Sequence, residues 1–184
     1  MEALLSLDGN ILLWIQEYLR ADWLTPVMLV ITKLGSIGFI WVVMSFLMLL
    51  FKKTRWIGLA GLGAIFFSLC VNNIVLKNLF ARTRPYEVVD GLILLTKKAS
   101  DFSFPSGHAG TSFAAAAAIY CMSKHRIKIL AIILAALIAF SRLYIGIHYP
   151  TDVIAGVLTG TMCGLLSVWI VRRISPVLGK VLHL

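Results

Sequence analysis

Residues 56–76 read WIGLAGLGAIFFSLCVNNIVL, and this stretch decides the class of fold. It contains no charged side chain. A transmembrane helix needs about 20 consecutive, mostly apolar residues, because it rises about 1.5 Å per residue through a hydrocarbon core of about 30 Å. The stretch is therefore predicted to cross a membrane as one helix.

Four further runs on either side have similar length and character: 34–51, 106–123, 127–147 and 153–171. A shorter run, 27–33, lies between Pro26 and Gly35 and could form a separate, broken helix. We therefore predict an all-α, polytopic transmembrane helix bundle of five to six helices, with residues 1–184 as a single integral-membrane domain.

The segment 10–20 precedes these runs and carries apolar side chains at helical spacing beside polar ones. It is predicted to form an N-terminal amphipathic helix lying in the membrane interface. The alternative is an ordinary flank of the first span.

The composition agrees with a membrane protein. The chain is 60% hydrophobic and 14% charged, with a mean hydropathy of +0.93, whereas soluble domains average about 45–50% apolar and about 25% charged residues. A disordered chain, a disulfide scaffold and a water-soluble globule are excluded. Cys70, Cys121 and Cys163 lie scattered in apolar runs without C-x-x-C spacing, so we expect neither a disulfide nor a zinc site.

The charges between the runs predict an orientation. One side holds nine cations and no carboxylate: Lys52, Lys53, Arg55, Lys124, Arg126, Lys128, Arg172, Arg173 and Lys180. The other side holds all eight acids: Glu2, Asp8, Glu17, Asp22, Glu87, Asp90, Asp101 and Asp152. The positive-inside rule places the first side in the cytoplasm. The net charge of +9 is then explained by cations that are retained at the cytoplasmic face and attracted to anionic lipid headgroups. It does not indicate nucleic-acid binding.

Polar clusters interrupt the apolar pattern on the outward side. In the last of them, His148 and Asp152 are four residues apart, with Pro150 between them. Proline favours the first turn of a helix, so a helix is predicted to begin near Tyr149, and Asp152 could reach back to His148. A carboxylate on one imidazole nitrogen leaves the other nitrogen as a directed lone pair, which suits a nucleophile. The alternative is that Asp152 only caps the helix and His148 sits at the interface.

The middle cluster places Ser106, a favoured N-cap, before an apolar helical run. Gly107 allows close approach to the backbone, and free N–H groups at a helix start bind phosphate. His108 could protonate a leaving group. A helix cap beside a satisfied histidine is the alternative.

The first cluster contains Lys77 and Arg84, seven residues apart, followed by Pro85. On one continuous helix ended by Pro85 the two cations would share a face and could bind phosphate oxygens. Snorkelling to lipid headgroups is the alternative, and Arg82 is a competing cation in this stretch. The acids of the following loop, Glu87, Asp90 and Asp101, are expected to be solvated, although they could shape headgroup choice.

Together, the clusters combine cations with a nucleophilic imidazole on one membrane side. They lack the carboxylate cluster that holds paired metals. This combination favours metal-free phosphoryl transfer, in which cations neutralise the charge on the phosphoryl oxygens.

The clusters resemble the three-part signature of the type 2 phosphatidic acid phosphatase superfamily, K-x6-R-P, P-S-G-H and S-R-x5-H-x3-D. In this chain the signature spans residues 77–152 without a departure: Lys77 to Arg84-Pro85, Pro105-Ser106-Gly107-His108, and Ser141-Arg142 to His148 to Asp152. The surrounding spans resemble the integral-membrane branch of the superfamily, not the soluble acid phosphatases or the vanadium haloperoxidases.

The resemblance implies a role for each residue. His148 would attack phosphorus and form a phosphohistidine, Asp152 would orient His148, and His108 would protonate the leaving oxygen. The phosphate-binding residues would be Lys77, Arg84, Ser106, Gly107 and Arg142. No metal and no cofactor is expected.

The outward loops are short and carry no soluble domain, so the substrate is expected to be a lipid phosphate or diphosphate anchored in the bilayer. We place undecaprenyl diphosphate first, the lipid that bacitracin sequesters. It would be recycled to the monophosphate at the outer face of a bacterial cytoplasmic membrane during wall synthesis. Phosphatidylglycerol phosphate or phosphatidic acid comes second, and a lipid A phosphatase or phosphotransferase third. An anion-binding transporter subunit is the non-enzymatic alternative, although residues 56–76 and 153–171 carry no charge along a pathway. The sequence leaves the oligomeric state open.

Overall fold

The structure is a computed structural model that describes residues 2–181, with side chains described from residue 5 to residue 176. The side chains of Glu2 and Lys180, both used in the charge argument, lie outside this part. The described elements are all helical, which confirms the predicted class: α1 (Glu2–Tyr18), α2 (Leu24–Leu34), η1 (Ser36–Gly38), α3 (Phe39–Leu49), α4 (Arg55–Ser68), η2 (Leu69–Leu76), α5 (Lys77–Phe80), α6 (Pro85–Val88), α7 (Gly107–Met122), α8 (Ile127–Tyr144) and α9 (Pro150–Val181).

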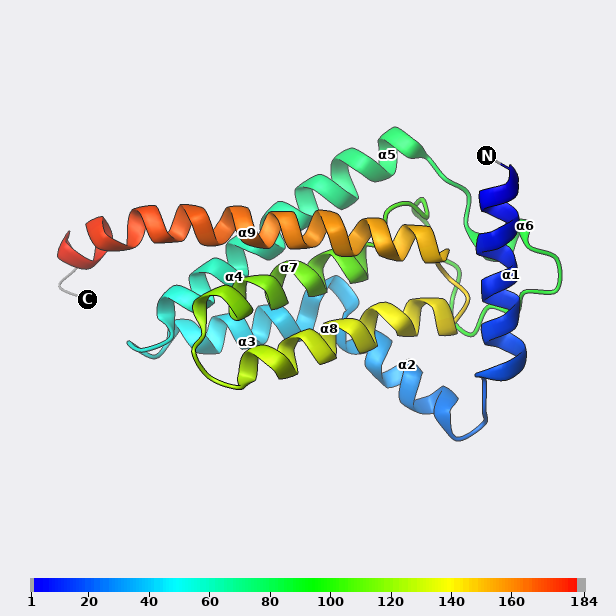
Figure 1. Ribbon diagram of the computed structural model, residues 1–184, viewed down its shortest axis with the longest axis horizontal. Coiled ribbons are helices and arrows are strands. Elements are labelled where there is room, and N and C mark those ends of the chain that lie inside the picture. Colours follow the sequence, from blue (N-terminus) through cyan, green and yellow to red (C-terminus); the bar gives the residue numbers. More distant parts are fainter. Residues whose placement is uncertain (1, 182–184) are drawn as a thin grey trace.

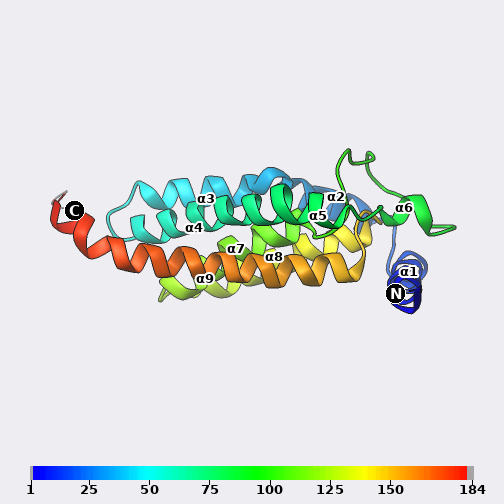
Figure 2. The same cartoon turned by 90° about the horizontal axis from the view of Figure 1, so that it is seen from above.

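Helix α7 forms the centre of the bundle and packs against α4, α8 and α9 (Figure 2). Its alanine run, Ala114–Ala118, is buried. The small residues of α9 allow close packing against α7, since a Cβ on Gly160 would overlap the Gly110 carbonyl oxygen. A Cβ on Gly156 would lie 2.6 Å from the carbonyl oxygen of Ser106. Small residues thus hold the start of α7 directly against α9.

Several segments are long and apolar enough to cross a membrane. They are Arg55–Val88, Ile127–Tyr144 and Pro150–Pro176, with the bent pair Leu24–Leu34 and Ser36–Leu49 as a fourth if it acts as one span. Helix α7 has 16 residues, which is shorter than a typical span. The finding supports a membrane protein, and the number of five to six spans stays a prediction.

The run near residue 30 does form a separate helix, as the sequence allowed. Helices α2 and α3 meet at a bend of 51°. The chain unwinds between them because Ile37 and Gly38 adopt positive φ angles of 54° and 69°. At the break, a Cβ on Gly35 would lie 2.9 Å from the His108 ring, so only glycine leaves room for that side chain.

The bundle has two different ends (Figure 1). One end carries the α3–α4 and α7–α8 connections and the end of α9. At the other end α8 turns into α9, the chain leaves α5 for α6, and α1 crosses the bundle.

Helix α1 begins well before the predicted segment 10–20 and divides its apolar residues between two faces. Leu12 and Ile15 are buried, whereas Ile11, Trp14 and Tyr18 are exposed. Its placement in a membrane interface stays a prediction.

Candidate active site

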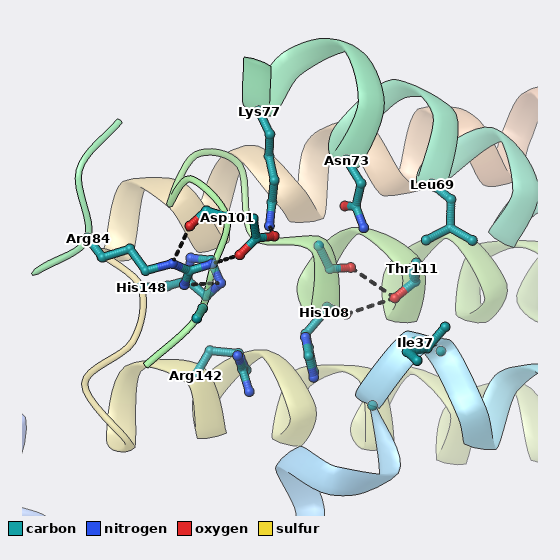
Figure 3. Close-up of a pocket in the computed structure, with 14 residues that line it drawn as sticks. Ile37, Leu69, Asn73, Lys77, Arg84, Asp101, His108, Thr111, Arg142 and His148 are labelled. Carbon is teal, nitrogen blue, oxygen red and sulfur yellow. Dashed lines mark hydrogen bonds and ion pairs between the residues drawn. The ribbon is translucent and has the colours of Figure 1, made fainter. Parts of the chain in front are cut away.

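A cavity of about 250 Å³ opens at the α1 end of the bundle. Six of the eight residues singled out from the sequence line it: Lys77, Arg84, Gly107, His108, Arg142 and His148. They come from α5, the following loop, the start of α7, the end of α8 and the α8–α9 connection (Figure 3). The remaining two, Ser106 and Asp152, lie buried behind the wall.

His148 and Asp152 lie together as their spacing predicts. Helix α9 begins at Pro150, which places Asp152 in its first turn. The Asp152 Oδ2 lies 3.5 Å from His148 Nδ1 and also accepts hydrogen bonds from the Ser103 hydroxyl at 2.5 Å and the Tyr149 backbone N–H at 3.0 Å. These contacts fix the carboxylate against one side of the imidazole ring.

The second imidazole nitrogen of His148 faces the cations of the cavity. Its Nε2 lies 3.4 Å from Arg84 Nη1. Burial lowers the pKa of His148 to about 3, although the hydrogen bond with Asp152 acts in the opposite direction. The imidazole is therefore neutral near pH 7. With its proton on Nδ1 beside Asp152, Nε2 carries the lone pair, and Arg84 Nη1 donates weakly to it at 3.4 Å.

The two cations of the first cluster converge, but not on one helix face. Ala81 adopts a left-handed conformation, with φ 43° and ψ 37°, and ends α5 after Phe80. Arg84 is extended because it precedes a proline, and Pro85 begins α6 instead of ending a helix. The prediction of a shared face was therefore wrong. Lys77 and Arg84 meet instead through the loop, where both pair with Asp101.

Asp101 was expected to be solvated, and the structure corrects this expectation. Its side chain is 51% exposed, yet it bridges Lys77 Nζ and Arg84 Nη2, the latter at 2.5 Å. Burial raises its pKa, but the hydrogen bond with Lys77 and the charges of Lys77 and Arg84 dominate, so the pKa is held below its usual value. An anion thus already lies between the two cations.

Two polar atoms on the other wall of the cavity have no hydrogen-bond partner among the described residues, His108 Nε2 and Arg142 Nε. Arg142 is held by its Nη1, which donates to the Thr32 hydroxyl of α2 at 2.5 Å. These groups are free to contact a bound molecule.

Ser106 is the N-cap of α7, but its hydroxyl makes no capping bond and is buried without a partner. Its backbone N–H donates to the Asp152 carbonyl oxygen at 3.0 Å, which ties the start of α7 to that of α9.

Sequence reasoning missed Asp8, Ser103 and Thr32, and it left the role of Arg82 open. Asp8 and Thr32 lie at least 45 residues from the signature region, and no local pattern links them to it. Of the three missed residues, only Ser103 lies near a recognised motif, two residues before Pro105 of the middle cluster.

Asp101, Asp152 and His148 are engaged with cations or with one another. Among the side chains of residues 5–176, no three of His, Cys, Asp or Glu are placed to hold a metal ion together.

Comparisons with known proteins agree with this geometry. Residues 57–176 match the PAP2 superfamily. The chain is 39% identical to an undecaprenyl-diphosphatase of Sulfolobus acidocaldarius, over 84% of this chain and 74% of the relative. It is 35% identical to phosphatidylglycerophosphatase B of Bacillus subtilis, over 78% and 73% of the two chains.

A crystal structure of a transmembrane PAP2 type phosphatidylglycerolphosphate phosphatase from Bacillus subtilis superimposes with a TM-score of 0.78 and 29% identity, covering 95% of this chain and 89% of that chain. The match of residues 57–176 contains the complete signature, which runs from Lys77 to Asp152. The chain therefore belongs to the PAP2 superfamily and is a phosphatase of its membrane branch.

Proposed function

We propose that this protein hydrolyses undecaprenyl diphosphate to undecaprenyl phosphate through a phosphohistidine on His148, and so supports recycling of the cell-wall lipid carrier. The observation that carries the chemistry is the pairing of His148 Nδ1 with Asp152, which aims Nε2 into a cavity bounded by Lys77, Arg84 and Arg142. A neutral, oriented imidazole facing fixed cations suits attack on a phosphate group.

In the first step, Nε2 of His148 forms a bond to the terminal phosphorus, and the bond from phosphorus to the bridging oxygen breaks. His108 gives a proton to the departing lipid phosphate. The imidazolium that forms on His148 is stabilised by Asp152. Water then attacks the phosphohistidine, gives its proton to His108 and releases inorganic phosphate.

The cations stabilise the charge on the transferring phosphoryl group, together with the unpartnered Ser106 hydroxyl and the backbone N–H of Gly107. Asp101 occupies the position between Lys77 and Arg84, so the incoming phosphate takes the place of its carboxylate. The three cations supply the neutralisation that Mg²⁺ supplies elsewhere, so activity should survive chelators.

Two features favour a lipid substrate with a diphosphate. The cavity wall includes two apolar side chains that a lipid chain could contact, Ile37 at the break between α2 and α3 and Leu69 at the start of η2. A diphosphate also needs less help from His108, because a phosphate monoester leaves more readily than an alkoxide. The named activity of the Sulfolobus relative points the same way.

A glycerolipid phosphate is the second candidate. The superimposed Bacillus subtilis structure is that of a phosphatidylglycerolphosphate phosphatase and covers 95% of this chain. The site geometry serves either substrate, because no described residue on the cavity wall distinguishes a prenyl from an acyl chain.

Competition between undecaprenyl diphosphate and phosphatidylglycerol phosphate in mixed micelles separates the two candidates. We expect kcat/KM to be at least about tenfold higher for undecaprenyl diphosphate, a difference of about 1.4 kcal/mol in transition-state binding. A preference for the glycerolipid would assign the second function and leave the chemistry of the site unchanged.

We also propose that the protein lies in a bacterial cytoplasmic membrane with the cavity on the extracytoplasmic side. The exposed residues Glu87 and His125 lie near opposite ends of the bundle, beside the cavity loop and in the α7–α8 connection. Single cysteines placed there should label from opposite sides of intact cells, with residue 87 outside. Labelling of both from one side would overturn the orientation.

A further inference from the structure

Arg82 lies behind the site and connects three elements. Its Nη1 donates to Asp152 Oδ1 at 2.6 Å and to the Thr151 hydroxyl at 2.7 Å, while its Nη2 donates to Asp8 Oδ2 at 2.8 Å. The guanidinium also stacks on the Tyr149 ring, 3.9 Å from the centroid. The start of α9 and the helix α1 are thereby joined through one side chain.

Asp8 completes this connection from α1. It is 2% exposed, and both of its oxygens are used. Oδ1 accepts the Thr151 backbone N–H at 3.2 Å, and Oδ2 accepts from the Thr151 hydroxyl and from Arg82. A buried carboxylate needs such partners, because an unpaired buried charge is costly.

The consequence for Asp152 follows from its two oxygens. Asp152 is fully buried, and its Oδ2 faces His148. A carboxylate held through one oxygen can still rotate about its Cβ–Cγ bond. Arg82 holds Oδ1, so the direction of Oδ2 toward His148 Nδ1 is fixed from the opposite side.

The position of Arg82 separates it from phosphate binding. The loop carries two arginines. Arg84 lines the cavity with His108 and His148, whereas Arg82 does not line this cavity. Arg82 lines a neighbouring cavity, but its Nη1 and Nη2 are already engaged by Asp152, Thr151 and Asp8.

We propose that Arg82 and Asp8 are positioning residues: Arg82 holds the Asp152 carboxylate in the orientation that His148 needs, and Asp8, on the crossing helix α1, holds Arg82. The inference rests on the proposed roles of His148 and Asp152. Helix α1, which precedes the whole signature region, thereby becomes part of the catalytic architecture.

The test compares Asp8→Asn with Glu17→Gln, measured on the same lipid phosphate in detergent micelles. Both variants remove one carboxylate from α1, but Glu17 is exposed and far from the Asp8 contacts along the helix. We expect Asp8→Asn to lower kcat about tenfold with KM within about twofold, since an interaction that acts on the nucleophile rather than on the bound phosphate changes kcat alone. Glu17→Gln should match the unaltered protein.

Arg82→Gln and the double variant Asp8→Asn/Arg82→Gln then test the order of the contacts. We expect Arg82→Gln to lower kcat about 100-fold, Arg82→Lys to recover part of the loss, and the double variant to be no worse than Arg82→Gln, because Asp8 acts through Arg82. Product inhibition by inorganic phosphate should stay within about threefold in every variant, since the phosphate-binding cations are untouched.

Three results would overturn the inference. They are an Asp8→Asn variant as active as Glu17→Gln, losses that multiply in the double variant, and weaker inhibition by inorganic phosphate with a raised KM, which would make Arg82 a phosphate ligand. If Asp8→Asn does not yield folded protein, the inorganic phosphate inhibition and KM measurements on Arg82→Gln and Arg82→Lys decide alone. Full activity of His148→Ala, measured in parallel, would refute the proposed function itself. Failure of the positioning inference and failure of the proposed function are therefore distinguishable.

Discussion

The two ends of the bundle carry charge in different ways. All four ion pairs between described Lys or Arg and Asp side chains lie at the α1 end, around the cavity and Asp152. At the opposite end the described cations make other contacts: Arg172 donates to the Cys121 carbonyl oxygen, and Arg173 and Lys128 lie over aromatic rings.

The difference indicates that lysine and arginine side chains serve two purposes in this protein. Exposed cations without carboxylates retain a helix end at a membrane face, and their exact placement matters little. Buried cations are costly unless paired, so each one at the α1 end is held in a defined geometry. Predictions that contrast the two ends therefore test whether geometry, and not charge alone, makes the site.

The largest effect is expected at the centre of the α1 end. His148→Ala removes the nucleophile and should lower kcat by at least about 10³-fold, which corresponds to about 4 kcal/mol. Asp152→Ala should lower kcat about 10²- to 10⁴-fold, because the imidazole loses its orientation and its charge is unsupported. Phosphate release from a lipid phosphate measures both, and near-normal rates in His148→Ala would refute the mechanism.

The next effect depends on the leaving group. His108→Ala should lower kcat about 100-fold on a lipid monophosphate, whose alkoxide must be protonated. On p-nitrophenyl phosphate the loss should stay below about tenfold, because that leaving group needs little protonation. Equal losses on both substrates would show that His108 does not act as the general acid.

A smaller effect, with the opposite sign, is expected at Asp101. Its carboxylate lies between Lys77 and Arg84, which we propose to be phosphate ligands. Asp101→Asn should therefore lower the inhibition constant of vanadate about three- to tenfold by removing a competing anion. The exposed acid Asp90 provides a matched control, since Asp90→Asn should leave the constant unchanged. Weaker inhibition in Asp101→Asn would mean that Asp101 organises the cations for phosphate.

The smallest effect is expected at the opposite end. Arg172→Gln removes an exposed cation far from the cavity, and its kcat/KM should stay within about twofold of the unaltered protein. Arg142→Gln, which removes a buried cation of the cavity wall, should lose far more in the same assay. A comparable loss in both would show that overall charge, and not placement, controls activity.

The two ends also differ in how far the sequence predicts them. The apolar runs predict the helical class and the separate helix before the first long run. The position of Pro150 predicts the start of α9 near Tyr149. The His148–Asp152 contact also follows, because it is local and depends on one helical turn.

The sequence failed where contacts depend on loops. The left-handed turn at Ala81 breaks the helix that would have aligned Lys77 with Arg84, and no glycine or asparagine marks it. Asp101 was expected to be solvated because nothing local indicates that its loop returns to the cations. Asp8 and Thr32 reach the site only through the packing of α1 and α2, which the local pattern of residues does not encode.

The central claim is that His148 carries the phosphoryl group, and trapping that intermediate tests it most directly. The protein is mixed with a ³²P-labelled lipid phosphate, quenched in alkali within the first turnover, and digested. We predict a labelled peptide containing His148, stable in alkali and labile in acid as a nitrogen–phosphorus bond is, and absent from His148→Ala. Label on any other residue, or turnover with inversion at phosphorus and no labelled protein, would contradict the account.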